Sequence, residues 1–239
     1  LYGNFEKASP ITYSYNVDIG AKGQNVYTTA TNGGYRYSSG TSFAGPIVAG
    51  AAALVRSEFP NYTANQTIEK LRVTADTIYH IGSNFNYQDK LGKGSLNVFR
   101  AVSDTTTPAI RNITNYLDIE GLFRIGDTVE IVGDFVNYLY KTSNLKIELN
   151  SYSNSITMID SIINVGVVNM LDTFTNTANK FSFIVNSDAL YNEVIWLRFS
   201  YTDGLYDDWQ YFKIVLNKDY FIIDENNFAV TVNSTGNIG

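Results

Sequence analysis

The sequence predicts a chain in two parts, an α/β segment followed by an all-β sandwich. Its composition, 44% hydrophobic and 17% charged, is typical of packed globular protein. Gly-rich loops and helix-like patterns lie before residue 104, and strand-like runs separated by Asn, Asp, Gly and Ser follow it. We therefore expect domains at 1–103 and 109–218, a linker at 104–108, and the start of a further module at 219–239.

Short strands and tight turns are expected before residue 41. Residues 15–19 and 25–29 are β-prone and are split by the Gly-rich stretch 20–23. Asn32, Gly33 and Gly34 then mark a tight turn. The pattern predicts strands that feed a loop.

Three helices are expected next. The first is predicted over 42–58, with Pro46 in its opening turn, where a missing backbone N–H costs little. Its Ala and Gly content predicts a thin helix buried on most sides, and its apolar stretch is too short to cross a bilayer. The second helix begins at the cap Thr63 and runs toward Asp76, and a short final helix lies within 92–102.

The second part shows regularly spaced strand patterns. The β-prone runs are 128–132, 145–149, 156–159, 181–185, 194–201 and 211–215. Such runs with polar turns between them are typical of an antiparallel, immunoglobulin-like sandwich. Asp203 and Gly204 predict a hairpin turn, and alternation directs Ile195, Leu197 and Phe199 to the core.

Charge and cysteine usage exclude several function classes. The net charge of -6 and a pI near 4.8 argue against nucleic acid as a partner. The absence of cysteine excludes disulfides, thiolate zinc sites and a cysteine nucleophile. Asp203, Asp207 and Asp208 have the spacing of a calcium loop, but turn residues explain them more simply. We expect no metal site and no required cofactor, with calcium as the alternative.

Residues 39–50, Ser-Gly-Thr-Ser-Phe-Ala-Gly-Pro-Ile-Val-Ala-Gly, carry the chemistry. Ser42 stands at the N-terminal end of a helix made of small residues. The helix dipole favours negative charge there, and uncapped backbone N–H groups can bind a developing oxyanion. Gly40 allows the tight turn before the serine. The alternative is a serine that only caps a buried helix.

The string from Gly40 to Gly50 strongly resembles the reactive-serine motif of the subtilase family of serine proteases. Residues 17–29 are similar to a strand and loop of that family, with Lys22 in place of the usual proline. Residues 92–101 resemble the closing segment of its catalytic domain. The resemblance covers roughly residues 1–103 and implies a partial subtilisin-like parallel sheet with helices.

The resemblance implies a serine endopeptidase that acts on peptide or protein substrates. Ser42 would be the nucleophile, and its backbone N–H would be one oxyanion donor. The chain starts at Leu1 rather than Met and stops soon after a strand pattern at 230–232, so we expect both ends to lie inside a longer protein. In the family the catalytic acid and base precede the serine by many residues, so we expect this chain alone to be inactive. The backbone of one segment would line the substrate's path: Tyr35, Tyr37, Ser38, Ser39 and Gly40.

Two residues invite other assignments. The order Ser42, Asp76, His80 is that of an α/β-hydrolase triad, but such enzymes need a Gly-x-Ser-x-Gly elbow, which is absent here. His80 is therefore interpreted as a loop histidine. Asp18 lies too close before the serine to be the triad acid and is interpreted as structural.

Two functions remain open at this point. One is the protease; the other is an adhesin or binding protein in which the protease part is degenerate and the sandwich acts. The sandwich resembles accessory domains that follow such proteases in secreted bacterial proteins, so we expect a secreted or cell-surface bacterial protein. No membrane-spanning segment and no nucleic acid partner are expected.

Overall fold

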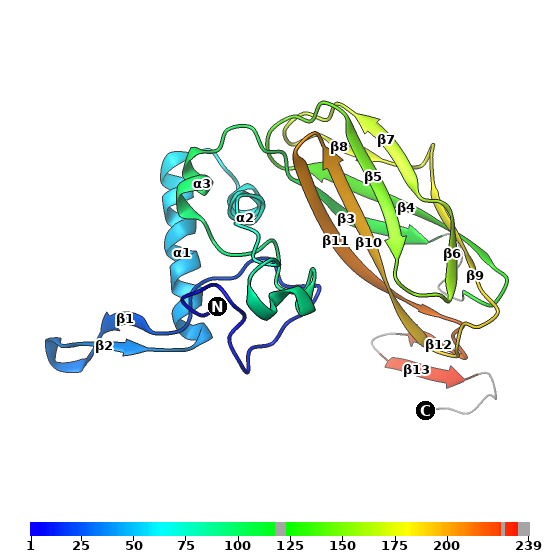
Figure 1. Ribbon diagram of the computed structural model, residues 1–239. Coiled ribbons are helices and arrows are strands. Elements are labelled where there is room, and N and C mark those ends of the chain that lie inside the picture. Colours follow the sequence, from blue (N-terminus) through cyan, green and yellow to red (C-terminus); the bar gives the residue numbers. More distant parts are fainter. Residues whose placement is uncertain (118–122, 226–227, 234–239) are drawn as a thin grey trace. The chain divides into compact units, whose positions relative to one another are not determined.

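The computed structural model describes residues 1–117, 123–225 and 228–233 (Figure 1). The chain divides into two compact units. The helical unit comprises Leu1–Ile110 together with the segments Asn137–Lys141 and Asn169–Asp172, and the sandwich unit comprises the remaining residues.

The helical unit contains one β-hairpin. Strands β1 (Val26–Thr29) and β2 (Tyr35–Ser38) pair antiparallel, and the short helix η1 (Thr31–Gly33) lies in the turn. The strand predicted over 15–19 is wrong, because its neighbourhood makes only an isolated parallel bridge between Gly20 and Ser95. Segment 93–96 lies beside residues 18–20 and exchanges three backbone hydrogen bonds with them, but this pairing does not continue along 15–17, so no strand forms. The parallel sheet is accordingly not seen there.

Three α-helices pack on one another: α1 (Thr41–Glu58), α2 (Ala64–Val73) and α3 (Val98–Ser103). Their small core consists of Ala51, Val55, Leu71 and Ala101. The predicted burial of α1 on most sides is wrong for the residues that the structure covers, because α2 and α3 cover only one face. Ala51 and Val55 are its only buried residues there.

Local capping explains where α2 begins. The backbone N–H of Gln66 donates to Thr63 Oγ1 at 3.2 Å, and the backbone N–H of Thr63 donates to Gln66 Oε1 at 3.0 Å. This reciprocal pair is a capping box and satisfies two helix-end donors. The helix therefore starts at the predicted residue.

The chain that follows the short helix η2 (Gly82–Tyr87) returns to lie beside Asp76. Asp76 and Ser95 exchange backbone hydrogen bonds of 2.8 and 2.9 Å. Gly94 has φ +128°, and a Cβ there would lie 1.9 Å from the Asp76 carbonyl oxygen. Only glycine fits this crossing. Asn97 then caps α3 by accepting a hydrogen bond from the backbone N–H of Arg100 at 2.9 Å.

The linker is anchored by a buried lysine. Lys70 has a fully buried side chain, donates to the backbone oxygen of Asp104, and lies 3.6 Å from its carboxylate. Its Nζ also lies over the rings of Phe59 and Tyr140, at 5.3 and 5.2 Å from their centroids. Burial lowers the pKa of Lys70, and the Asp104 carboxylate opposes this only in part. Asp104, the first linker residue, is thus tied to α2.

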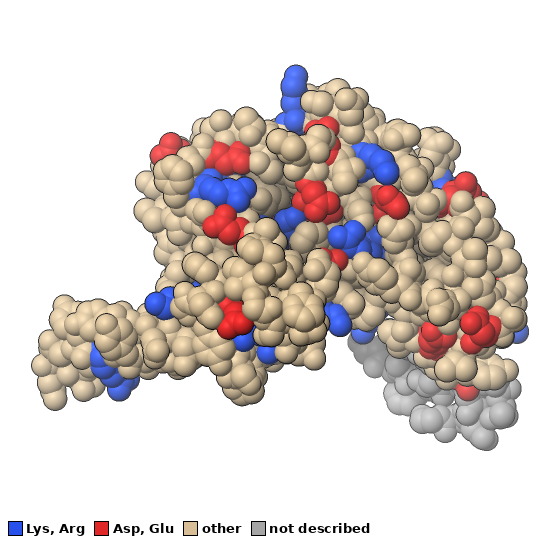
Figure 2. All heavy atoms as spheres, viewed as in Figure 1, with Lys and Arg blue, Asp and Glu red and all other residues tan. Residues whose placement is uncertain are grey.

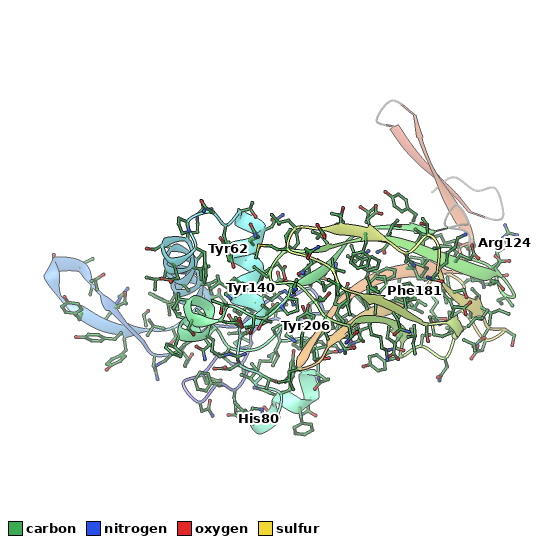
Figure 3. All side chains as sticks on the ribbon, turned by 90° about the horizontal axis from the view of Figure 1, so that it is seen from above. Tyr62, His80, Arg124, Tyr140, Phe181 and Tyr206 are labelled. Atoms are coloured by element: carbon green, nitrogen blue, oxygen red, sulfur yellow. The ribbon has the colours of Figure 1, made fainter. Side chains whose placement is uncertain are left out.

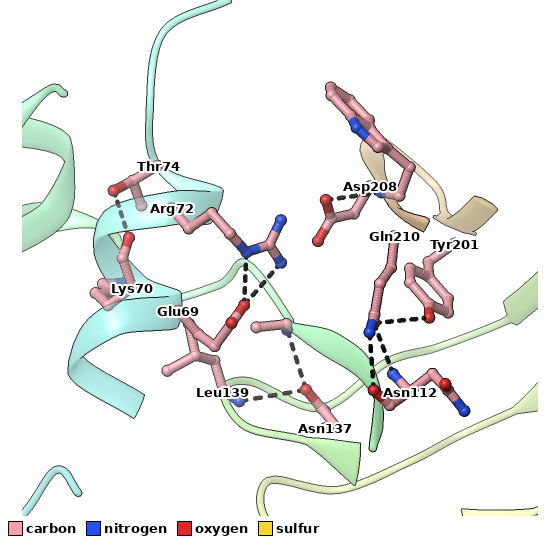
Figure 4. Close-up of polar contacts among 12 residues, drawn as sticks. Glu69, Lys70, Arg72, Thr74, Asn112, Asn137, Leu139, Tyr201, Asp208 and Gln210 are labelled. Carbon is pink, nitrogen blue, oxygen red and sulfur yellow. Dashed lines mark hydrogen bonds and ion pairs between the residues drawn. The ribbon is translucent and has the colours of Figure 1, made fainter. Parts of the chain in front are cut away.

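The loop Asn137–Lys141 also belongs to the helical unit. Gln66 Nε2 donates to the Tyr138 carbonyl at 3.1 Å, and the hydroxyl of Tyr62 donates to that of Tyr140 at 3.4 Å (Figure 3). Asn137 Oδ1 accepts hydrogen bonds from the backbone N–H groups of Ala109 and Leu139, at 3.1 and 3.3 Å (Figure 4). The loop Asn137–Lys141 is therefore shaped by its own hydrogen bonds and held against α2.

Two sheets make up most of the described part of the sandwich unit. One has the order β3 (Ile110–Leu117), β4 (Thr128–Asn137), β9 (Phe181–Val185), β6 (Ile156–Asp160), with β8 (Thr173–Thr175) also paired to β4. The other has the order β11 (Tyr206–Leu216), β10 (Glu193–Asp203), β5 (Leu145–Ser151), β7 (Ile162–Gly166). All six predicted strands are confirmed, whereas β3, β7 and β8 were not predicted. A separate hairpin, β12 (Tyr220–Glu225) and β13 (Phe228–Asn233), follows.

Aromatic side chains join the two sheets. Phe199 on β10 lies 5.4 Å from Phe135 on β4 and 5.6 Å from Phe181 on β9, between ring centroids. All three are fully buried. Ile195 and Leu197 are buried beside Phe199, as the alternation predicts. The predicted hairpin turn at Asp203 and Gly204 joins β10 to β11.

Candidate active site

Ser42 lies in the first turn of α1 and is exposed. The preceding Gly40 is the N-cap residue and makes no side-chain cap, and the first turn carries no acidic residue. The backbone N–H of Phe43 donates to the Gly40 carbonyl at 3.1 Å, whereas neither the hydroxyl nor the backbone N–H of Ser42 donates a hydrogen bond to another described residue. The Ser42 hydroxyl and its N–H are thus both available, at the positive end of the helix.

Two glycines shape the turn before Ser42. The backbone N–H of Gly40 donates to the Gly23 carbonyl at 2.7 Å. Gly40 has φ +153°, and a Cβ there would lie 3.2 Å from Ser42 Oγ; a Cβ on Gly23 would lie 2.9 Å from the Gly40 carbonyl oxygen. This close approach fixes the chain before the serine. The sequence marks Gly23 only as part of the Gly-rich stretch 20–23 and does not predict its contact with Gly40, because the two residues are distant in sequence.

The predicted substrate path coincides with β2 and the turn after it. Tyr35, Tyr37 and Ser38 lie on β2, and Ser39 Oγ accepts a hydrogen bond from the backbone N–H of Asn25 at 3.0 Å. β2 pairs with β1 on one edge only, in a two-stranded sheet. Its other edge has no strand partner in the part of the chain that the structure describes.

The alternative triad is not assembled. Asp76 accepts hydrogen bonds from Asn97 Nδ2 at 2.8 Å and Arg100 at 3.0 Å, so its carboxylate is held by these groups. His80 is exposed on a turn at the outer edge of the unit (Figure 3) and makes no hydrogen bond to described residues. Neither Asp76 nor His80 therefore forms a hydrogen-bonded triad with Ser42 within the described residues.

The remaining acidic candidates are held by structural contacts. The Asp18 carbonyl accepts a hydrogen bond from the backbone N–H of Lys93 at 3.0 Å. The Asp203 carboxylate accepts the backbone N–H groups of Ser143 and Asn144 at 2.8 and 2.7 Å. Asp208 is fully buried and accepts hydrogen bonds from the Tyr206 hydroxyl and the backbone N–H of Trp209, and Asp207 is exposed. No group of three His, Cys, Asp or Glu that could hold a metal occurs within the described residues.

Residues 4–102 match the profile of the family described as "Subtilase family". This stretch of the chain is a subtilase segment. A thermostable alkaline protease of Halalkalibacterium halodurans is 42% identical over 98 residues, which are 41% of this chain and 25% of that protein. Subtilisin DY of Bacillus licheniformis is 38% identical over 95 residues, 40% of this chain and 32% of that protein. The resemblance found in residues 1–103 is confirmed.

The subtilase segment spans a quarter to a third of each of these relatives. Similar solved structures include an alpha-2-macroglobulin fragment of Escherichia coli, with a TM-score of 0.35 and 12% identity over 50% of this chain and 18% of that one. A likeness that weak does not establish a shared fold. None of the described helices is both long and apolar enough to span a membrane.

Proposed function

We propose that this chain carries the nucleophile of a subtilisin-type serine endopeptidase, and that Ser42 is that nucleophile. The observation that carries the proposal is the exposed Ser42 hydroxyl at an uncapped helix N-terminus, inside the subtilase segment. The family implies protein or peptide substrates. The homologous proteases named above come from bacteria, and we propose a secreted or cell-surface location.

The chemistry follows from the position of Ser42. Ser42 Oγ attacks the scissile carbonyl carbon while a histidine base takes its proton, and the backbone N–H of Ser42 binds the oxyanion. The C–N bond then breaks, the histidine protonates the leaving amine, and water hydrolyses the acyl-serine. The histidine and its aspartate come from polypeptide outside this sequence. The isolated chain is therefore expected to show no turnover.

The open edge of β2 offers backbone groups to an extended substrate. Tyr35, Tyr37 and Ser38 on this strand, with Ser39 and Gly40 after it, lead directly to Ser42. An added strand gains affinity from main-chain hydrogen bonds without depending on substrate side chains. No cofactor is required for this proposed chemistry, with calcium as the alternative.

The test is fluorophosphonate labelling of the full-length protein. Wild-type protein is expected to be labelled and Ser42→Ala to lose the label completely. Ser57→Ala, which changes an exposed serine on the same helix, is the matched control and should keep it. Labelling that survives Ser42→Ala would refute the nucleophile. No labelling of a folded wild-type protein would instead favour the binding protein or adhesin.

A further inference from the structure

Three tyrosines form a ring cluster on the β1–β2 hairpin, here called the tyrosine patch: Tyr27, Tyr35 and Tyr37. Their exposed fractions are 61%, 65% and 71%. Tyr27 stacks on Tyr35 with centroids 5.4 Å apart, and its ring lies 5.1 Å from that of Tyr37. Tyr27 is thus the centre of one continuous aromatic surface.

The tyrosine patch occupies a face without charge. Tyr27 pairs with Tyr37, and Thr29 pairs with Tyr35, so these four side chains share one face of the hairpin. Arg36, opposite Thr28, lies on the other face. Figure 2 shows the projecting hairpin as a largely uncharged lobe with a single basic group. A ligand of this face gains nothing from charge.

The hairpin has no core of its own. None of the residues of β1 or β2 is buried, and the hairpin extends away from the helices (Figure 1). An isolated two-stranded hairpin is only marginally stable in water, so the ring contacts contribute to its order. The same stacking holds the tyrosines in place as a preformed surface.

The size of the tyrosine patch limits its occupant. A tyrosine buries about 150–250 Å² when it is fully covered, so three rings at these exposures offer on the order of 400 Å². A stable protein interface needs about 800 Å² on each partner. The patch is too small for a folded partner or a second copy of this chain, and large enough for a few residues of extended polypeptide.

The patch also lies on the chain that leads to Ser42. Ser42 lies five positions after Tyr37, and five residue steps of fully extended chain span at most about 17 Å. A substrate strand of about five residues can bridge the same distance. The part of the substrate that meets the patch is therefore a few residues away from the bond that is cleaved.

We propose that the tyrosine patch is a second substrate-binding site, which selects an uncharged stretch containing proline or aromatic residues on the polypeptide being cleaved. This inference rests on the proposed function. Proline-rich segments are extended before they bind and dock on aromatic surfaces, and aromatic side chains stack on exposed rings. Charged stretches find no partner on this face.

The test compares three substrates in the full-length protein. All three contain the same short cleavable core. The first substrate is the core alone. The second extends the core on both sides by eight Gly and Ser residues, and the third extends it on both sides by eight residues that include proline and tyrosine. Wild-type protein is expected to prefer the proline–tyrosine extension over Gly–Ser about tenfold in kcat/KM, mainly through KM. Tyr27→Thr should lower this ratio to about twofold, and the triple change of all three tyrosines to threonine should lower it to one.

A ratio cancels any effect that a substitution has on both substrates. The matched control, Val26→Thr with Thr28→Val, alters the opposite face of β1 and should keep the wild-type ratio. Direct binding of the fluorescent proline–tyrosine peptide to the Ser42→Ala protein, followed by anisotropy, should be lost in the added Tyr27→Thr change. A ratio of one in wild type, or an unchanged ratio in the tyrosine variants, overturns the inference.

Other results distinguish a failure of the tyrosine-patch proposal from a failure of the proposed protease function. Labelled Ser42 and normal cleavage of the short core, with no preference between extensions, would overturn the tyrosine patch alone. No cleavage of any substrate and no labelling would overturn the proposed function. A dimer in sedimentation that Tyr27→Thr dissociates would place a second copy on the patch and overturn its assignment to substrate.

Discussion

Helix α1 and strand β10 are both long, largely apolar elements, and they differ in how much of them is covered. β10 lies between β11 and β5 and buries Ile195, Leu197, Phe199 and Tyr201 against the opposite sheet. α1 is longer, yet only Ala51 and Val55 are buried, and Leu54 is 54% exposed. The sandwich unit thus holds a core of large side chains, whereas the core shared by the three helices is limited to Ala51, Val55, Leu71 and Ala101.

The difference shows that the two units are ordered by different interactions. In the sandwich unit, stability comes from burial of large rings between two sheets. In the helical unit, much of the order comes from particular polar and steric ties: the capping box at Thr63, the crossing at Gly94 and the buried Lys70. Replacing a large apolar side chain by alanine should therefore lower the unfolding free energy by different amounts in the two units.

The largest expected effect is at Phe199. Phe199→Ala removes a fully buried ring that contacts Phe135 and Phe181, and it should cost about 3–5 kcal/mol of unfolding free energy. Leu54→Ala on α1 should stay within about 0.5 kcal/mol. Urea unfolding followed by tryptophan fluorescence suits the first variant, because Trp196 and Trp209 both lie in the sandwich unit.

For Leu54→Ala the probe is ellipticity at 222 nm, since α1, α2 and α3 all belong to the helical unit. A cost for Leu54→Ala similar to that for Phe199→Ala would break the comparison. It would mean that α1 is covered in solution.

The next largest expected effect compares two glycines of the helical unit, Gly94 and Gly45. Gly94→Ala forces a Cβ against the Asp76 carbonyl and should cost about 2–3 kcal/mol. Gly45→Ala is the matched control, because a Cβ there meets no atom within 4 Å and alanine favours a helix, so it should add up to about 1 kcal/mol. Both are measured by thermal unfolding at 222 nm. If Gly94→Ala left the unfolding temperature unchanged, the close approach of residue 94 to the Asp76 carbonyl would be contradicted.

Sequence reasoning succeeded where the signal is local. Thr63 is a typical capping residue, and its position just before an apolar helical pattern is enough to identify the start of α2. The runs that became β4 and β10 show alternation over enough residues to be recognised. By contrast β8, Thr173–Thr175, is too short for any periodicity.

Other features depend on distant contacts. Lys70 looks like an ordinary surface lysine in sequence, and it is buried only because Phe59, Asp104 and Tyr140 converge on it. The Gly23 contact with Gly40 likewise has no local signal. The Ser42 position follows from its motif and its helix start, but the base that would activate it cannot be found from residues that surround it here.

A smaller effect concerns the linker and pH. The Asp104 carboxylate is partly buried, which opposes ionisation, but hydrogen bonds from Thr106 and Thr107 and the nearby Lys70 lower its pKa below the usual 3.8. Its stabilisation is therefore complete above the unfolded value of 3.8 and is lost as pH falls through the lowered folded value. Thr107→Val removes one charge-assisted hydrogen bond and should cost about 1.5 kcal/mol at neutral pH.

At low pH the carboxylate of Asp104 is protonated, so the unfolding free energies of Thr107→Val and wild type should converge. Urea unfolding at 222 nm between pH 7 and pH 2 measures this. A difference that stays constant over the whole range would show that the hydroxyl acts independently of the Asp104 charge.

The smallest expected effect is at the capping box of α2, whose residue Thr63 is exposed. Thr63→Ala removes the side-chain oxygen that accepts the Gln66 N–H and should cost about 1 kcal/mol, measured by urea unfolding at 222 nm. Thr63→Ser keeps the side-chain oxygen and should therefore retain nearly all of the wild-type unfolding free energy. Tryptophan fluorescence from the sandwich unit should show the same midpoint in all three proteins. If that midpoint also fell in Thr63→Ala alone, the two units would unfold together, and the contrast between α1 and β10 would describe packing but not independent stability.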